Sequence, residues 1–139
     1  MENRTFYNEV LTEHNIRPVH KVKLMQPTVT KRGVNPSCGD DITLELVVDE
    51  NGIIVDGGYT GDGCAISQAS ADIMLELVIG KTKEEALKLK DTFLRMIKEK
   101  ITDEELETLE EAAALQDISH MPSRVKCAVL GWRTLEESL

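Results

Sequence analysis

Three cysteines and one aspartate are the residues whose types and surroundings are best suited to chemistry in this chain. Cys38 lies in the stretch "NPSCGDD", where Asn-Pro before the cysteine and glycine after it predict a loop rather than a helix or strand. Such a loop would present the Cys38 sulfur and the Asp40 carboxylate on one exposed side. Three uses are open for this pair: half of a metal site, a nucleophile with an acidic neighbour, or a tight turn without chemistry.

The other two cysteines lie in surroundings that also favour the thiolate form. Cys64 follows Gly-Asp-Gly where a predicted strand gives way to a helix, and a helix N-terminus stabilises negative charge. Cys127 has Lys126 beside it and Arg124 one helical turn before it, and nearby cations lower the pKa of a thiol. Three thiolates and the Asp40 carboxylate would make a four-coordinate set that suits Zn²⁺. Arg124 or Lys126 would offset part of the negative charge of that site.

Plainer interpretations stand beside this one. No two of the cysteines are close enough in sequence for a Cys-x-x-Cys motif, so they could be ordinary thiols, with Cys64 and Cys127 filling space in the core. A second plain interpretation is a zinc site that only stabilises the fold, although such sites are more often closed by four Cys or His ligands. The histidines lie outside the cysteine motifs and are expected to be surface or packing residues rather than ligands: His14, His20 and His120.

Hydrophobic periodicity predicts the elements that position these residues. Alternating apolar residues on both sides of an Asn-Gly turn predict a β-hairpin near residues 41–60, and residues 28–34 indicate an edge strand. Residues 5–16 predict an amphipathic helix with Phe6 and Val10 on one face. Further helices are predicted from residue 66 to Gly80 and in stretches that begin at Thr82, Thr102 and Pro122. The expected class is therefore α+β, with a small antiparallel sheet of about three strands packed against several helices.

Length and composition limit the classes of protein that remain. With 139 residues, 41% of them hydrophobic, the chain is expected to form a single domain, residues 1–139, whose core needs no disulfides. A net charge of -9 repels phosphate backbones and anionic membranes, so neither nucleic acid nor a membrane is expected as a partner. The N-terminal sequence has no signal-peptide pattern, and no apolar run approaches the roughly 20 residues that span a bilayer. These features predict a cytoplasmic protein with reduced thiols.

The stretches "NPSCGDD", "GYTGDGCAISQASADIML" and "MPSRVKCAVLGW" together resemble the iron–sulfur cluster assembly scaffold family (IscU/NifU N-terminal-like), and within it the SufU branch. The resemblance runs from about Phe6 to Trp132. Scaffold-type members carry a histidine before the third cysteine, where this chain has Lys126, and the acidic stretch 102–115 resembles a helical insertion of SufU-type members. The order of Pro and Arg in residues 15–21 departs from the family pattern, and the metal motifs are untouched by it.

The resemblance implies a zinc-dependent sulfurtransferase in iron–sulfur cluster biogenesis. Carried over residue by residue, the zinc ligands would be Cys38, Asp40, Cys64 and Cys127. The protein would accept persulfide sulfur from a pyridoxal phosphate-dependent cysteine desulfurase of the SufS type and relay it to an assembly complex of the SufBCD type. Cys38 is expected to be the acceptor, because a Ser-Cys-Gly loop can move away from the metal whereas helices hold the other two cysteines.

Three points stay open at the level of sequence. Arg124 is a candidate for steadying the persulfide anion, and a surface cation or helix-end salt bridge is its plainer interpretation. One alternative function is a scaffold on which a [2Fe–2S] cluster is assembled, since thiolates also hold such clusters. Another is a non-catalytic zinc-binding interaction module, in which the metal only fixes the loops.

Overall fold

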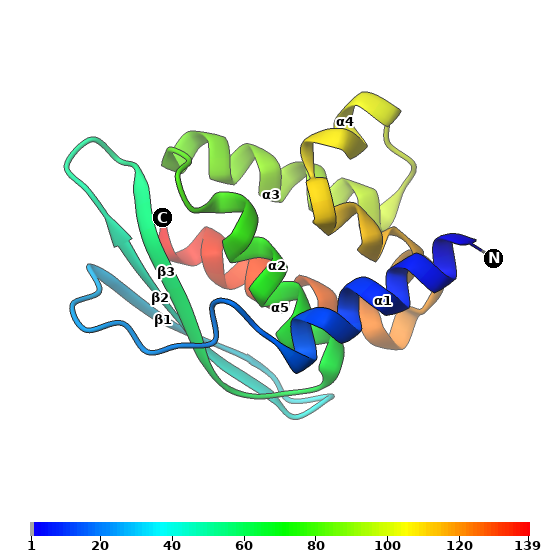
Figure 1. Ribbon diagram of the computed structural model, residues 1–139, viewed down its shortest axis with the longest axis horizontal. Coiled ribbons are helices and arrows are strands. Elements are labelled where there is room, and N and C mark those ends of the chain that lie inside the picture. Colours follow the sequence, from blue (N-terminus) through cyan, green and yellow to red (C-terminus); the bar gives the residue numbers. More distant parts are fainter. Residues whose placement is uncertain (1) are drawn as a thin grey trace.

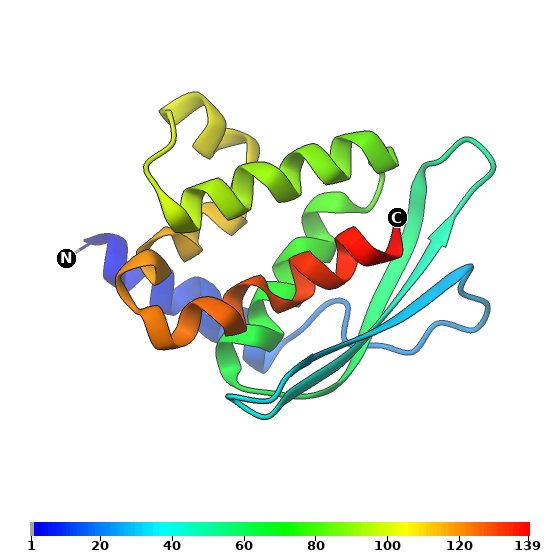
Figure 2. The ribbon, with the colours of Figure 1, turned by 180° about the vertical axis from the view of Figure 1, so that it is seen from behind.

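The computed structural model describes residues 2–139, with side chains from Glu9 onward, so the expected position of the Phe6 side chain lies outside the described residues. Three strands form one antiparallel sheet in the order β1-β2-β3, and the helices lie to one side of it (Figures 1 and 2). This arrangement confirms the predicted α+β class. The elements are α1 (Glu2–Ile16), β1 (Val29–Asn35), β2 (Asp40–Val48), β3 (Ile54–Asp62), α2 (Ala65–Val78), α3 (Lys83–Lys98), α4 (Asp103–Thr108), the 3₁₀ helix η1 (Glu110–His120) and α5 (Pro122–Ser138).

Strands β2 and β3 form the predicted hairpin. The turn between them places Gly52 at φ +78, a backbone conformation that glycine adopts without steric cost. The predicted edge strand is β1, which pairs with β2 along its whole length and ends with Asn35 opposite Asp40. This register places the loop that carries Cys38, residues 36–39, directly beyond the last pair of the ladder.

The core lies between the sheet and the helices that cover it. Helix α5 packs against β1 and β2, and α2 packs against both β3 and α5. Trp132 of α5 is fully buried and stacks on Phe93 of α3, with ring centroids 4.2 Å apart and planes 8° apart. Among the helices that the structure describes, none combines the length and the apolar character needed to cross a membrane.

Two capping boxes mark helix starts as the sequence predicts. Thr82 is the N-cap of α3 and Thr102 is the N-cap of α4. In each box the threonine side chain accepts a hydrogen bond from the backbone N–H of the glutamate three residues later, and that glutamate side chain accepts one from the threonine backbone N–H. The acidic stretch 102–115 is only partly α-helical, however. Helix α4 ends at Thr108, Glu110 takes a φ of +49, and the chain continues as η1. The predicted acidic helix is therefore one short α-helix followed by a 3₁₀ helix.

Residues 17–28, which we call the strap, connect α1 to β1 along the free edge of β3. The Tyr59 N–H donates to the His20 carbonyl oxygen at 3.0 Å. A Cβ atom on Gly58 would come within 2.4 Å of a strap carbonyl oxygen, so only glycine allows this close approach. The departure from the family pattern at residues 15–21 thus falls where α1 ends and the strap begins.

His14 of α1 is buried in a polar network. Its Nδ1 lies 2.6 Å from Asp72 Oδ2 of α2, and its Nε2 lies 2.9 Å from Glu111 Oε1 of η1. Asp72 is fully buried and also accepts hydrogen bonds from the strap amides of Val19 and His20. The network therefore joins α1 and the strap to α2 and η1, which gives His14 a packing role.

Candidate metal centre

The loop that carries Cys38 is short and is supported by its own backbone. The Cys38 N–H donates to the Asn35 carbonyl oxygen at 3.2 Å, and the Gly39 N–H donates to the Pro36 carbonyl oxygen at 3.3 Å. Gly39 has a φ of +70 with open space where a Cβ would project. The Cys38 side chain is half-buried. The sequence prediction of a turn that presents this thiol is confirmed, but the prediction that the Asp40 carboxylate shares its exposed side is wrong, because Asp40 is the first residue of β2 and is 1% exposed.

The structure gathers three of the four predicted ligands into one cluster. Ligand atoms of Cys38, Asp40 and Cys127 lie within 4.8 Å of one another. The Cys38 and Cys127 sulfur atoms are 3.1 Å apart, although they belong to the β1–β2 loop and to α5. Packing of α5 against β1 is what brings these sulfurs together.

Cys64, the fourth predicted ligand, lies beside this cluster at the N-cap of α2. Its Sγ accepts a hydrogen bond from the Ser67 N–H at 3.4 Å, and its own N–H donates to Asp40 Oδ1 at 2.8 Å. Its sulfur does not lie within 4.8 Å of all three of the other ligand atoms. The Cys64 thiol nevertheless lies near enough to Cys127 to raise the pKa of that group. The β1–β2 loop and the start of α2 lie at the same end of the molecule (Figures 1 and 2).

Asp40 is held as a carboxylate although it is 1% exposed. Burial works to raise the pKa of Asp40, but hydrogen bonds from the Cys64 amide, Asn35 and Ser67 outweigh it and leave the pKa below its ordinary value. Asn35 Nδ2 and Ser67 Oγ each lie 3.1 Å from a carboxylate oxygen. A buried anion surrounded by donors is an oxygen ligand ready for a cation.

The prediction that the surroundings of Cys127 favour thiolate is wrong for the protein by itself. Cys127 is fully buried, and burial raises the pKa of its thiol, with hydrogen bonds to Cys38 and Cys64 raising it further. Lys126, which was expected to help, is exposed to solvent. A bound cation would reverse this balance, because a coordinating thiol loses its proton. Metal binding at this cluster should therefore release protons.

Arg124 lies on the first turn of α5, at the solvent side of the cluster. The pKa of Arg124 is raised by its cysteine neighbours, first by Cys64 and then by Cys127. A cation therefore stands next to two of the thiols. Taken together, the donors are thiols and a carboxylate, which are ligand types that Zn²⁺ accepts, so the residues present fit this metal.

Sequence reasoning missed two residues of this site, Asn35 and Ser67. In the sequence, Asn35 before a proline predicts only a turn. Its contact with Asp40 depends on the strand register, which the local sequence does not specify. Ser67 follows the N-cap Cys64 by three residues, a spacing that places it in the first turn of α2. That spacing was the one available signal, and it does not identify Asp40 as the partner of Ser67.

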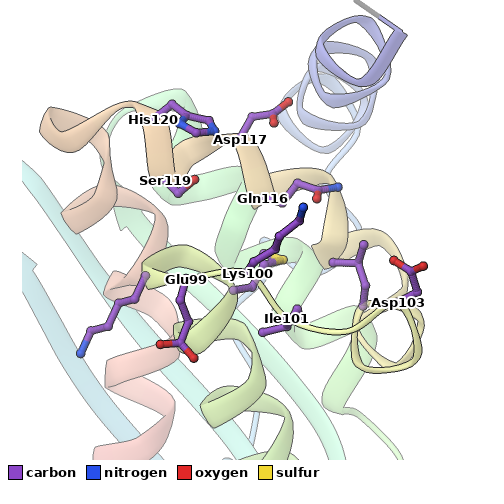
Figure 3. Close-up of a pocket in the computed structure, with 11 residues that line it drawn as sticks. Glu99, Lys100, Ile101, Asp103, Gln116, Asp117, Ser119 and His120 are labelled. Atoms are coloured by element: carbon purple, nitrogen blue, oxygen red, sulfur yellow. The ribbon is translucent and has the colours of Figure 1, made fainter.

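None of the cysteines lines the cavity shown in Figure 3. This cavity of about 560 Å³ lies between the end of α3, the segment before α4, and η1. Its lining carries charges of both signs, among them Glu99, Lys100 and Asp103, together with His120. The mixture favours no single class of ligand, so the cysteine cluster remains the candidate functional site.

Comparison with known proteins places this chain in a family. The NifU-like N-terminal domain family matches residues 6–139. The iron–sulfur cluster assembly scaffold protein IscU of Thermotoga maritima is 40% identical over 136 residues, which cover 98% of this chain and 94% of that protein. The zinc-dependent sulfurtransferase SufU of Bacillus subtilis is 37% identical over 135 residues, which cover 97% of this chain and 90% of that protein.

A solved structure gives the same result. The crystal structure of SufU from Fervidobacterium islandicum AW-1, described as an iron–sulfur cluster assembly scaffold protein for the SUF system, matches with a TM-score of 0.88 at 37% identity. The match covers 97% of each chain. The chain therefore belongs to the NifU-like N-terminal domain family, among the iron–sulfur cluster assembly proteins of the IscU and SufU type.

Proposed function

We propose that the protein is a zinc-dependent sulfurtransferase that accepts persulfide sulfur on Cys38 and passes it on for iron–sulfur cluster assembly. The observation that carries this proposal is the position of Cys38. Its sulfur lies 3.1 Å from that of Cys127, yet the half-buried Cys38 side chain sits in a turn whose next residue, Gly39, has open space where a Cβ would project. A sulfur acceptor needs a thiol that belongs to the site and can also leave it.

The proposed zinc ligands are Cys38, Asp40, Cys64 and Cys127. When bound, Zn²⁺ would keep the thiols deprotonated at neutral pH and would balance part of their charge. Asp40 contributes an oxygen that is already anionic, because donors surround it. Cys64 is included because its thiol lies beside Cys127. The name of the Bacillus subtilis relative supports the choice of zinc.

The transfer step is an exchange at sulfur. The Cys38 thiolate attacks the outer sulfur of a donor persulfide, and a new S–S bond forms between Cys38 Sγ and that outer sulfur. The bond between the outer sulfur and the donor cysteine breaks, and the donor cysteine leaves as a thiolate. The transferred sulfur keeps its oxidation state and its charge, and the electron pair of the broken bond leaves with the donor thiolate. Asp40, Cys64 and Cys127 would stay in place, since the strand β2 and two helices hold them.

The proposed donor is a pyridoxal phosphate-dependent cysteine desulfurase of the SufS type, and the proposed acceptor is an assembly complex of the SufBCD type. The cofactor that splits cysteine would belong to the desulfurase. Arg124 is proposed to steady the incoming persulfide anion, because its guanidinium is exposed and lies beside the thiols of Cys64 and Cys127.

Sulfur transfer from a desulfurase with labelled cysteine tests this proposal. The parent protein should accumulate labelled persulfide and stimulate the desulfurase. Cys38→Ala should do neither, because the attacking thiol is gone. Ser37→Ala is the matched control, since Ser37 is an exposed neighbour in the same loop, and it should behave as the parent. Labelling of Cys38→Ala at the parent's level would refute the assignment of Cys38.

A scaffold for a [2Fe–2S] cluster is the second candidate. The Thermotoga maritima relative is named as such a scaffold, and thiolates also hold iron–sulfur clusters. A lysine at residue 126, where scaffold-type members of the family carry a histidine, favours the transferase. The two candidates differ in what the protein retains: a scaffold holds iron and sulfide, and the transferase holds zinc. A zinc module without catalysis would bind zinc and accept no sulfur.

A further inference from the structure

We propose that Asn35 is a positioning residue of this centre: its side-chain amide braces Asp40 against Cys127 and thereby sets the affinity of the site for metal. The inference rests on the proposed metal site and goes beyond it, because Asn35 is not one of the proposed ligands. It would act through two ligands rather than on the metal or the sulfur.

Asn35 is placed for this role by the strand register. It is the last residue of β1 and pairs with Asp40, the first residue of β2, so both side chains emerge on the same face. That face is covered, since Asn35 is 6% exposed and Asp40 is 1% exposed. Helix α5 packs on β1 and brings Cys127 to the same point. The amide therefore lies where the sheet meets α5.

The Asn35 side-chain amide donates to two groups of the site. Asn35 Nδ2 lies 3.1 Å from Asp40 Oδ2 and 3.8 Å from Cys127 Sγ. An amide NH₂ group has two hydrogens, so it can serve a carboxylate and a sulfur at the same time. The reverse orientation would point the amide oxygen at two acceptors. The partners thus fix which way the side chain is turned.

Asn35 donates to a different oxygen of the Asp40 carboxylate than the Cys64 amide and Ser67 do. Cys64 N–H and Ser67 Oγ–H both donate to Asp40 Oδ1. Among the N–H and O–H groups that the structure describes, Asn35 is the one that donates to Oδ2, and the Cys127 thiol is a weaker neighbour of the same carboxylate. Without it, the carboxylate would be held at one oxygen and could rotate about that point. Fixed rotation matters because a metal ligand must present its lone pair in one direction.

The Asn35 side chain would also keep the site together during sulfur transfer. Asn35 stands at the base of the Cys38 loop, and its carbonyl oxygen accepts the Cys38 N–H. When Cys38 leaves, Asp40 and Cys127 must keep their separation although they belong to β2 and α5. The Asn35 side chain links the two directly. Loss of such outer partners typically weakens metal affinity by about 10–100-fold, and that range is expected here.

Zinc affinity of Asn35→Leu, measured by competition with a chelator, tests the proposal. Leucine has the same branched shape and donates no hydrogen bond, so affinity should fall by about 10–100-fold. The visible absorption of the Co²⁺-loaded variant should also change, because the Asp40 oxygen no longer keeps its direction. Unfolding of the metal-free variant should stay near the parent. Val34→Ala, an exposed neighbour on β1, is the control and should keep parent affinity.

A double-mutant cycle with Asp40→Ala separates a brace from a general packing effect. If Asn35 acts through Asp40, the Asn35→Ala change should cost much less affinity in the Asp40→Ala background than in the parent. Parent-like zinc affinity and Co²⁺ absorption in both Asn35 variants would overturn the inference, and so would fully additive losses in the cycle. A parent protein that binds no zinc would overturn the proposed function as well, whereas a parent that binds zinc with insensitive Asn35 variants would overturn this inference alone.

Discussion

Two buried groups of the site respond to burial in opposite ways. Asp40 is surrounded by donors, so its pKa falls and it is an anion before any metal arrives. Cys127 is fully buried, with the thiols of Cys38 and Cys64 beside it, so its pKa rises and it keeps its proton. The protein therefore offers one ready anion and leaves the deprotonation of a buried thiol to the cation. Affinity for the metal should consequently increase with pH.

Arg124 can be separated from metal binding, because it is exposed and is not a proposed ligand. Arg124→Gln should slow sulfur transfer from the desulfurase by about tenfold and flatten its salt dependence, since a cation that attracts the persulfide anion is lost. Zinc content should not change. Transfer kinetics at two salt concentrations provide the measurement. Arg133→Gln, an exposed position on the same helix, is the control, and an equal slowing in both variants would argue against a specific role for Arg124.

At the scale of residues, the sequence revealed the site wherever the signal is local. The Cys38 turn follows from its proline and glycine neighbours, and the position of Cys64 follows from glycines before a helix. The state of Cys127 was misjudged because its burial depends on how α5 packs, which neighbours in sequence do not encode. Asn35 was missed because its partners depend on strand register and on that same packing.

At the scale of elements, the His14 network holds α1, α2 and η1 together. Burial works to lower the pKa of His14, but hydrogen bonds and charges from Asp72 and Glu111 outweigh it, and the pKa is raised above its ordinary value. A raised pKa means that the folded state binds the proton more tightly than the unfolded state. The contribution of this network is fully present below the unfolded pKa of about 6.5 and is lost as pH rises through the higher folded value.

The pH dependence of unfolding tests this network. Between about pH 6 and pH 8, the free energy of unfolding of the parent should fall by about 1–2 kcal/mol more than that of His14→Gln, because the charged hydrogen bonds are lost. Denaturant titrations at several pH values measure the difference. His120→Gln changes an exposed histidine and should keep the parent's dependence. A variant at His14 with the same pH slope as the parent would contradict the assignment.

Helices with local start signals were predicted well. The boxes at Thr82 and Thr102 fix helix starts through contacts three residues apart. The change from α4 to η1 was not predicted, because a glutamate at φ +49 carries no mark in the sequence. The change of helix type coincides with packing, because η1 lies against α1, α2 and α3. That residues 102–115 are an insertion stays a prediction.

At the scale of the whole molecule, the fold brings the cysteine motifs to one end. The β1–β2 loop, the start of α2 and the first turns of α5 are far apart in sequence and meet where the sheet ends. Hydrophobic periodicity predicted the kinds of element but not this meeting, which required the packing of α5 and α2 on the sheet. The resemblance of the three motifs to one family predicted it instead, and the matches to IscU and SufU proteins agree.

The metal and sulfide content of protein purified without oxygen tests the central claim most directly, because the relatives carry two kinds of name. The zinc-dependent transferase predicts colourless protein with about one zinc ion per chain and no acid-labile sulfide. Brown protein with iron and acid-labile sulfide in place of zinc would contradict it and would identify a cluster scaffold.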